Sequence, residues 1–111
     1  MRLGSIMTVE EEPRLYLVGW RIVAAFRPVS YHFVGYDAHD GYGRVSSPIQ
    51  SFDSAHRTGV TRSGRVYELV DESSPANQAN AAWDHFCKKN GILEWTDKTL
   101  QVSDPPSNPP R

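Results

Sequence analysis

The sequence predicts a single α+β domain. Its expected core is a small twisted antiparallel sheet of four to six strands, which stays open or curls into a partly open barrel, with one helix in the C-terminal half. Short segments rich in β-branched and aromatic residues alternate with turn residues between positions 15 and 70. An apolar stripe at helical spacing follows them. The length of 111 residues and the hydrophobic content of 39% suit one modest core and leave no room for two domains.

The first two strands are expected at residues 15–26 and 29–36. Valine, isoleucine, tyrosine and tryptophan surround Gly19 in the first segment, which favours a strand over a helix. Gly19 itself marks a bulge, because glycine inside a strand often accompanies one. Residues 37–43 are rich in aspartate and glycine and form the loop that follows.

A third strand and a hairpin complete the expected sheet. The third strand covers residues 44–52, and because Pro48 cannot donate a main-chain hydrogen bond, this strand is an edge strand or is bulged there. The hairpin joins residues 58–62 to residues 65–70 through a two-residue Ser63-Gly64 turn, in which glycine supplies the positive φ that such a turn needs.

One helix follows the hairpin. Ser73 and Ser74 are candidate N-caps, and Pro75 suits the first helical position. Gly91 suits the left-handed position that ends a helix. The side chains expected to face the sheet recur at helical spacing and are Ala79, Ala82, Trp83, Phe86 and Cys87.

The domain is expected to span residues 15–102, with residues 92–102 adding a short strand whose Trp95 lies against the body. Residues 1–14 form a loosely ordered segment. Residues 103–111 contain four prolines and form an extended, solvated tail, and deletion of residues 104–111 is expected to leave stability unchanged. No apolar stretch is long enough for a signal peptide or a membrane-spanning helix, so we expect a cytoplasmic protein without membrane contact.

The second half of the chain carries a distinctive set of residues: GRVSSPI at 43–49, TRSGRVYEL at 61–69, and Trp83 and Cys87 on the helix that ends at Asn90-Gly91. In these residues the chain resembles a group of small bacterial accessory proteins of uncharacterised function, often carried on mobile elements. The resemblance covers about half of the chain. It implies a small accessory protein of the bacterial cytoplasm and implies no catalytic or ligand-binding residue.

The sequence gives only weak support for two possible sites of metal binding or catalysis. The loop after the second strand contains three potential metal ligands within four residues, namely Asp37, His39 and Asp40. Tight turns use the same residue types, and no full ligand set can be assembled from the sequence. Whether this loop binds a metal therefore stays open. Cys87 and His85 are two positions apart on a helix and therefore diverge, which excludes them as a directly paired nucleophile and base. We expect a protein that is not an enzyme and has no cofactor.

Arginines mark the candidate binding surface. Residues 15–70 contain six arginines and no lysine, and arginine suits bidentate contacts with phosphate or carboxylate. In the expected hairpin Arg62 lies directly opposite Arg65, an arrangement that an anion between the two guanidinium groups would stabilise. The candidate binding residues are Arg57, Arg62, Arg65, Tyr42 and Arg44.

These observations favour a protein that binds partners without catalysing a reaction. The leading hypothesis is an accessory protein that docks onto a larger protein assembly, an inhibitor of host defence being one such protein. The alternative is a small nucleic-acid-binding or regulatory protein that uses the basic hairpin, with exposed tyrosines stacking on bases. The formal net charge of −1 excludes a globally basic nucleic-acid coat. The identity of the partner, the biological process and the oligomeric state stay open.

Overall fold

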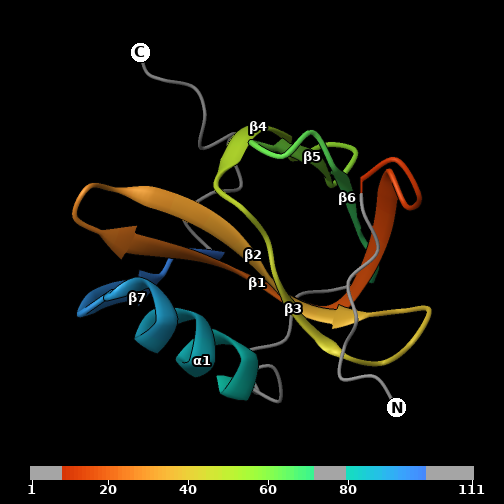
Figure 1. Cartoon of the computed structure of the whole chain (residues 1–111). Helices are drawn as coiled ribbons and strands as arrows, with labels where there is room; N and C mark the ends of the chain where they lie inside the picture. The colour runs from red at the N-terminus through yellow and green to blue at the C-terminus, as the bar shows by residue number, and fades with distance from the viewer. Residues whose placement is uncertain (1–8, 72–79, 100–111) are drawn as a thin grey trace.

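The computed structural model describes residues 9–71 and 80–99. Within these residues, seven strands and one helix form a small α+β fold dominated by its sheet (Figure 1). In chain order the elements are β1 (Arg14–Phe26), β2 (Ser30–Asp37), β3 (Gly43–Val45), β4 (Ile49–Asp53), β5 (Thr58–Thr61), β6 (Val66–Leu69), α1 (Asn80–Asn90) and β7 (Glu94–Asp97).

The strands form one sheet in the order β3-β2-β1-β6-β5-β4, and β7 pairs with β1. All pairs are antiparallel except β1 and β6, which run parallel with Leu15 opposite Tyr67. The expectation of a purely antiparallel sheet is therefore wrong at this one pair. Its cause is the path of the chain: the direction reverses at each connection except that between β3 and β4, so β6 returns beside β1 in the same direction as β1.

The expected third strand is divided in two. Residues 46–48 separate β3, which pairs with β2, from β4, which pairs with β5. Ser46 continues the contact with β2, since its N–H donates to the Phe33 carbonyl at 2.9 Å and its hydroxyl accepts the Phe33 N–H at 2.9 Å. Pro48 then lacks an N–H for either neighbour. The sheet curls round but stays open between β3 and β4, which coarsely matches the expected partly open barrel.

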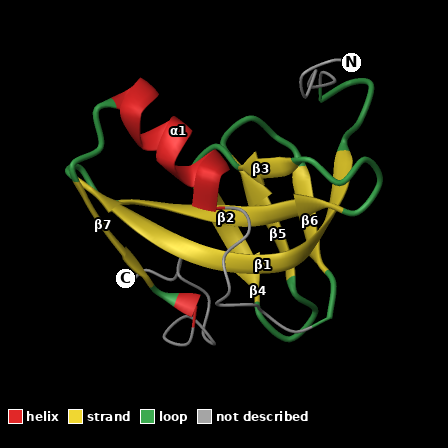
Figure 2. Cartoon of the chain, turned by 90° about the horizontal axis from the view of Figure 1, so that it is seen from below, coloured by secondary structure: helices red, strands yellow, loops and turns green. Residues whose placement is uncertain are grey.

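Strand β1 bends at Gly19, where the sequence predicts a bulge. Gly19 has φ +56°, and the pairing with β2 shifts register between Val18 and Arg21. The predicted bulge is confirmed. On the edge of β1 away from β2, the first part of the strand pairs with β6 and the last part pairs with β7. Figure 2 shows β1 running through the length of the sheet.

Two hydrophobic cores lie on opposite faces of β1 and β2. The neighbouring residues Phe33 and Val34 are both fully buried, one in each core, because successive side chains of a strand point to opposite faces. Inside the curl, Phe33 packs against Phe52 and Tyr67, and a Cβ on Gly59 would lie only 2.4 Å from its ring. On the outer face, α1 covers the sheet (Figure 1).

Helix α1 packs through the predicted stripe. Trp83 is 1% exposed and Cys87 is buried, while Phe86 packs against the same core and is half-buried. The helix ends as predicted: Gly91 has φ +67°, and the N–H of Ile92 donates to the Cys87 carbonyl at 2.9 Å, which closes a Schellman-type cap. The predicted caps at positions 73–75, the segment 1–8 and the tail from residue 100 lie outside the described residues.

A buried histidine ties the open side of the sheet to the helix. His32 Nδ1 lies 2.8 Å from the Ser46 carbonyl, which can only accept, so Nδ1 carries the proton and Nε2 accepts from the Ser30 hydroxyl at 2.8 Å. The ring also packs against Trp83 and Phe86, with centroids 5.7 and 5.1 Å away. Burial lowers the pKa of His32, and the nearby Arg62 charge lowers it further, against the opposing effect of the Ser46 bond.

Replacement of Trp83 tests the packing of α1 on the sheet. Trp83→Ala should lower the free energy of unfolding by about 3–5 kcal/mol, because it empties the centre of the outer core. Trp83→Phe should cost less, since the indole N–H has no hydrogen-bond partner among the described residues. Leu93→Ala is the control, because Leu93 is 91% exposed. Urea denaturation measures all three, and a Trp83→Ala midpoint equal to that of the wild type would contradict the packing.

The buried His32 predicts an acid-sensitive fold. The unfolded chain takes up a proton on this ring near pH 6.5, whereas the folded protein does so only at lower pH, so the free energy of unfolding should fall as pH drops below about 6.5. His32→Gln keeps a donor and an acceptor and should flatten this dependence between pH 7.5 and 5.5. His39→Gln, at an exposed position, should leave the dependence unchanged. Equal slopes in wild type and His32→Gln, measured by urea denaturation, would refute the assignment.

Candidate interaction surfaces

The hairpin between β5 and β6 has a three-residue loop instead of the predicted two-residue turn. Val60 lies opposite Val66 and Gly59 opposite Tyr67. The N–H of Thr61 donates to the Arg65 carbonyl at 3.1 Å, so residues 62–64 form the loop. Gly64 has φ +95° as predicted, but a left-handed glycine at the third loop position is typical of three-residue hairpins. The predicted register is therefore wrong by one residue.

This shift separates the two arginines that the sequence places face to face. Arg62 lies exposed in the loop, whereas Arg65 is 7% exposed and its Nε donates to the Glu12 carbonyl at 3.0 Å. A one-residue slip moves a side chain to the other face of a strand. The predicted clamp, with an anion between directly opposed Arg62 and Arg65, does not exist in this register.

Arg57 is separated from both Arg62 and Arg65. It lies at the far end of β5 from Arg62, about 17 Å along the strand at roughly 3.3 Å per residue. Its guanidinium lies 5.8 Å from the centroid of the Trp20 ring and donates to the Asp71 carbonyl. The cation–π contact and the hydrogen bond give Arg57 a structural role at this end of the sheet.

Arg44 is held inside the loop that carries the possible metal ligands. Its guanidinium is 7% exposed and contacts carboxylate oxygens of Asp37 at 3.4 Å and Asp40 at 2.7 Å. Asp37 also accepts the main-chain N–H of His39 at 2.8 Å. In the part of the chain that the structure describes, no group of three or more histidine, cysteine, aspartate or glutamate side chains is placed to hold a metal. Tyr42 lies at the surface, 38% exposed.

Of the five predicted binding residues, the structure brings Arg44 and Arg65 together. Both line a pocket of about 230 Å³ at the edge of β3, below α1. Tyr67 lines the same pocket, and its hydroxyl is hydrogen-bonded to Arg65. Burial raises the pKa of Tyr67 against the lowering effect of the two guanidinium groups, so the hydroxyl stays protonated at neutral pH.

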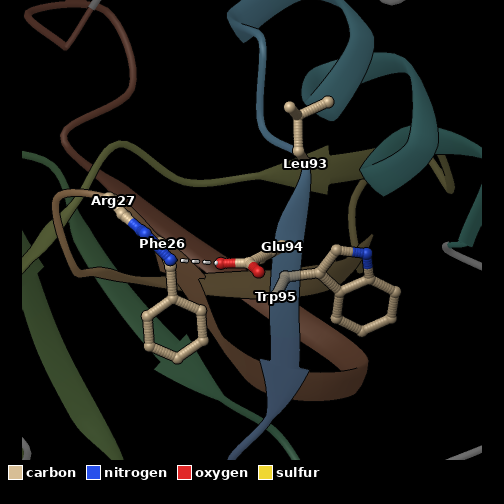
Figure 3. A pocket seen from close by; sticks show the side chains of 5 residues that line it. All are labelled: Phe26, Arg27, Leu93, Glu94 and Trp95. Atoms are coloured by element: carbon tan, nitrogen blue, oxygen red, sulfur yellow. Dashed lines mark hydrogen bonds and ion pairs between the residues drawn. The ribbon is translucent and has the colours of Figure 1, made fainter.

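A second surface lies beside β7 and was not predicted. A groove of about 610 Å³ follows the start of this strand and the end of β1 (Figure 3). Leu93 is 91% exposed and Trp95 is 42% exposed, which is unusual for large apolar side chains. Arg27 and Glu94 form an ion pair at 2.9 Å across the same groove (Figure 3). The groove is lined by Phe26, Arg27, Leu93, Glu94 and Trp95.

Strand β7 presents an open edge on this surface. Among the described strands, β1 is the only partner of β7. The N–H of Lys98 donates to the Ile22 carbonyl at 2.8 Å, and alternation along an antiparallel ladder then turns the main-chain groups of Trp95 and Asp97 outward. Trp95 is anchored by an edge-to-face contact with Trp83, with centroids 5.7 Å apart. The sequence predicts that Trp95 lies against the body but gives no sign that Leu93 is exposed.

Two groups with catalytic chemistry are placed unfavourably for catalysis. Ser30 and His32 have the distance of a nucleophile and its base, but the ring is buried under α1. Burial raises the pKa of Cys87, assisted by the charge of Asp84, which keeps the thiol protonated and unreactive.

Comparisons with known proteins give no relative: no protein-family model, curated protein or solved structure matches the chain. In residues 9–71 and 80–99, no helix has the length and apolar character that crossing a membrane requires. The candidate surfaces therefore stand on their own geometry.

Proposed function

We propose that this protein is a non-enzymatic binding module that captures an extended segment of a partner protein along the open edge of β7. The observation that carries the proposal is the exposure of Leu93 and Trp95 beside that edge. An open strand edge offers unpaired main-chain donors and acceptors, to which an extended peptide adds as a further strand.

The side chains around the edge indicate the chemistry of the partner segment. Trp95 is held in place by its contact with Trp83, so it offers apolar area at a low entropic cost. The charged side chains nearby are already paired, Arg27 with Glu94 and Arg21 with Asp97 at 3.3 Å. A partner segment that is apolar and uncharged gains most from this surface, because it leaves both ion pairs intact.

The main chain of β7 indicates which residues would pair with the partner segment. The outward N–H and C=O groups of Trp95 and Asp97 provide the donors and acceptors for two residues of an incoming strand. Docking onto a larger assembly, with inhibition of host defence as one example, is the biological role that fits such a module. Nucleic acid is the weaker alternative, because Arg57, Arg62 and the buried Arg44 and Arg65 do not form one basic surface.

Selection from a phage-displayed library of unstructured peptides tests this proposal. Selected peptides should be apolar and uncharged, and Leu93→Ser should weaken their binding by about tenfold or more, as expected for an anchoring apolar contact. Tyr16→Ser is the matched control, because Tyr16 is also exposed, at 51%, but lies on the first part of β1, far along the strand from β7.

Hydrogen exchange gives the second measurement in the same experiment. Bound peptide should protect the amides of Trp95 and Asp97, which face the open edge, and leave the Thr96 amide unchanged. Peptides that bind equally well to wild type and Leu93→Ser, or that protect no amide of β7, would show that this edge is not the docking site.

A further inference from the structure

We propose that the pocket between β3, β6 and α1 binds a small carboxylic acid with an apolar body. This site is separate from the β7 edge and does not depend on the proposed function. Residues of β3, α1 and the segment 65–67 line the pocket, and β3 and β6 are not neighbours in the sheet order, so the curl of the sheet brings them to one site.

The polar wall is built from side chains that the fold already holds in position. Arg44 is fixed by Asp37 and Asp40, and Arg65 is fixed by the Glu12 carbonyl and the Tyr67 hydroxyl. Arg44 and Arg65 are both buried residues, each with an exposed fraction of 7%. Side chains fixed before a ligand arrives lose little entropy on binding, which favours recognition of a charged group.

The charges at the pocket favour an anion. The Arg44 charge is already shared with Asp37 and Asp40, whereas Lys89 lines the same pocket and adds a positive charge. Lys89 projects from the last turn of α1, and within the described residues it has no carboxylate within ion-pair distance. A ligand carboxylate would balance the Lys89 charge, and the planar guanidinium groups match the geometry of a carboxylate.

The opposite wall sets the shape of the ligand. Val45, Ala82 and Phe86 line it with apolar side chains. The helix is held close to β3 at Gly43, where a Cβ would lie 3.0 Å from the Cβ of Ala82. The volume of about 230 Å³ is below the range of roughly 300–1,000 Å³ that drug-sized ligands occupy, so the ligand is small, with a single ring or a short chain.

Titration with benzoate, followed by amide chemical shifts, tests the inference. Benzoate should shift the amides of β3, residues 65–67 and the C-terminal half of α1, and it should saturate. Benzamide, which has the same shape without the charge, should bind at least about tenfold more weakly. Inorganic phosphate, which has the charge without the apolar body, should also bind more weakly than benzoate.

The adjacent lysines Lys88 and Lys89 supply a matched pair of variants. Lys89→Gln should weaken benzoate binding about fivefold, the loss expected for one charge-assisted contact. Lys88→Gln removes the same charge from the same turn but does not line the pocket, and should have no effect. Both positions are exposed, so both variants should fold.

Three results would overturn the inference. Absence of saturable shifts with benzoate would remove the site. Equal affinity for benzamide or for phosphate would show that the site does not select an acid with an apolar body. Equal losses in Lys88→Gln and Lys89→Gln would show that binding reports only the general charge of the helix. None of these results bears on β7, so the two proposals fail independently.

Discussion

The hydrogen bonding of β1 along both of its edges is the constraint on which the rest of the structure depends. One edge pairs with β2, and the other is divided between β6 and β7. A straight β1 would keep β6 and β7 in one plane. The bend at Gly19 instead lets β6 close the curl while β7 extends beside the helix. Space is not the limiting factor at Gly19, since the nearest atom to an added Cβ is 3.8 Å away; the φ of +56° is what requires glycine. At Gly59, by contrast, lack of space is what requires glycine, because the ring of Phe33 occupies the place of a side chain.

Both proposed binding surfaces occur where this hydrogen bonding and packing are incomplete. The curl of the sheet buries the inner core, but the path ends at β3 and β4 without pairing them, and the pocket of Arg44 and Arg65 lies at the β3 end. The helix covers the outer core, but β7 pairs with β1 on one side and has no neighbour among the described strands on the other. A small sheet covered by one helix leaves edges uncovered, and a ligand or partner can gain free energy from contacts at these two places.

Much of the fold could be predicted because its signals are local. The stripe with Trp83 and Cys87, the bend at Gly19 and the helix end at Gly91 each depend on residues a few positions apart, and each is confirmed. The parallel pairing of β1 with β6 has no local signal, since it joins segments about fifty residues apart. Pro48 indicated an interruption in the third strand, but only the contacts of Ser46 with Phe33 show that the chain changes partner there.

The candidate site was harder to predict because one residue of turn length decides which face a side chain takes. Gly64 suits a two-residue turn and a three-residue loop equally well, and the difference moves Arg65 from the hairpin surface into the pocket. Arginines that are close in sequence thus take separate roles, with Arg62 in solvent and Arg57 on Trp20. An exposed guanidinium is screened by water and salt, and holding it in place for a ligand costs side-chain entropy. A buried one, fixed by Tyr67 and the Glu12 carbonyl as Arg65 is, interacts more strongly with a nearby charge. Burial and supporting contacts are therefore better guides than clustering in the sequence to the arginines that a fold holds ready for an anion.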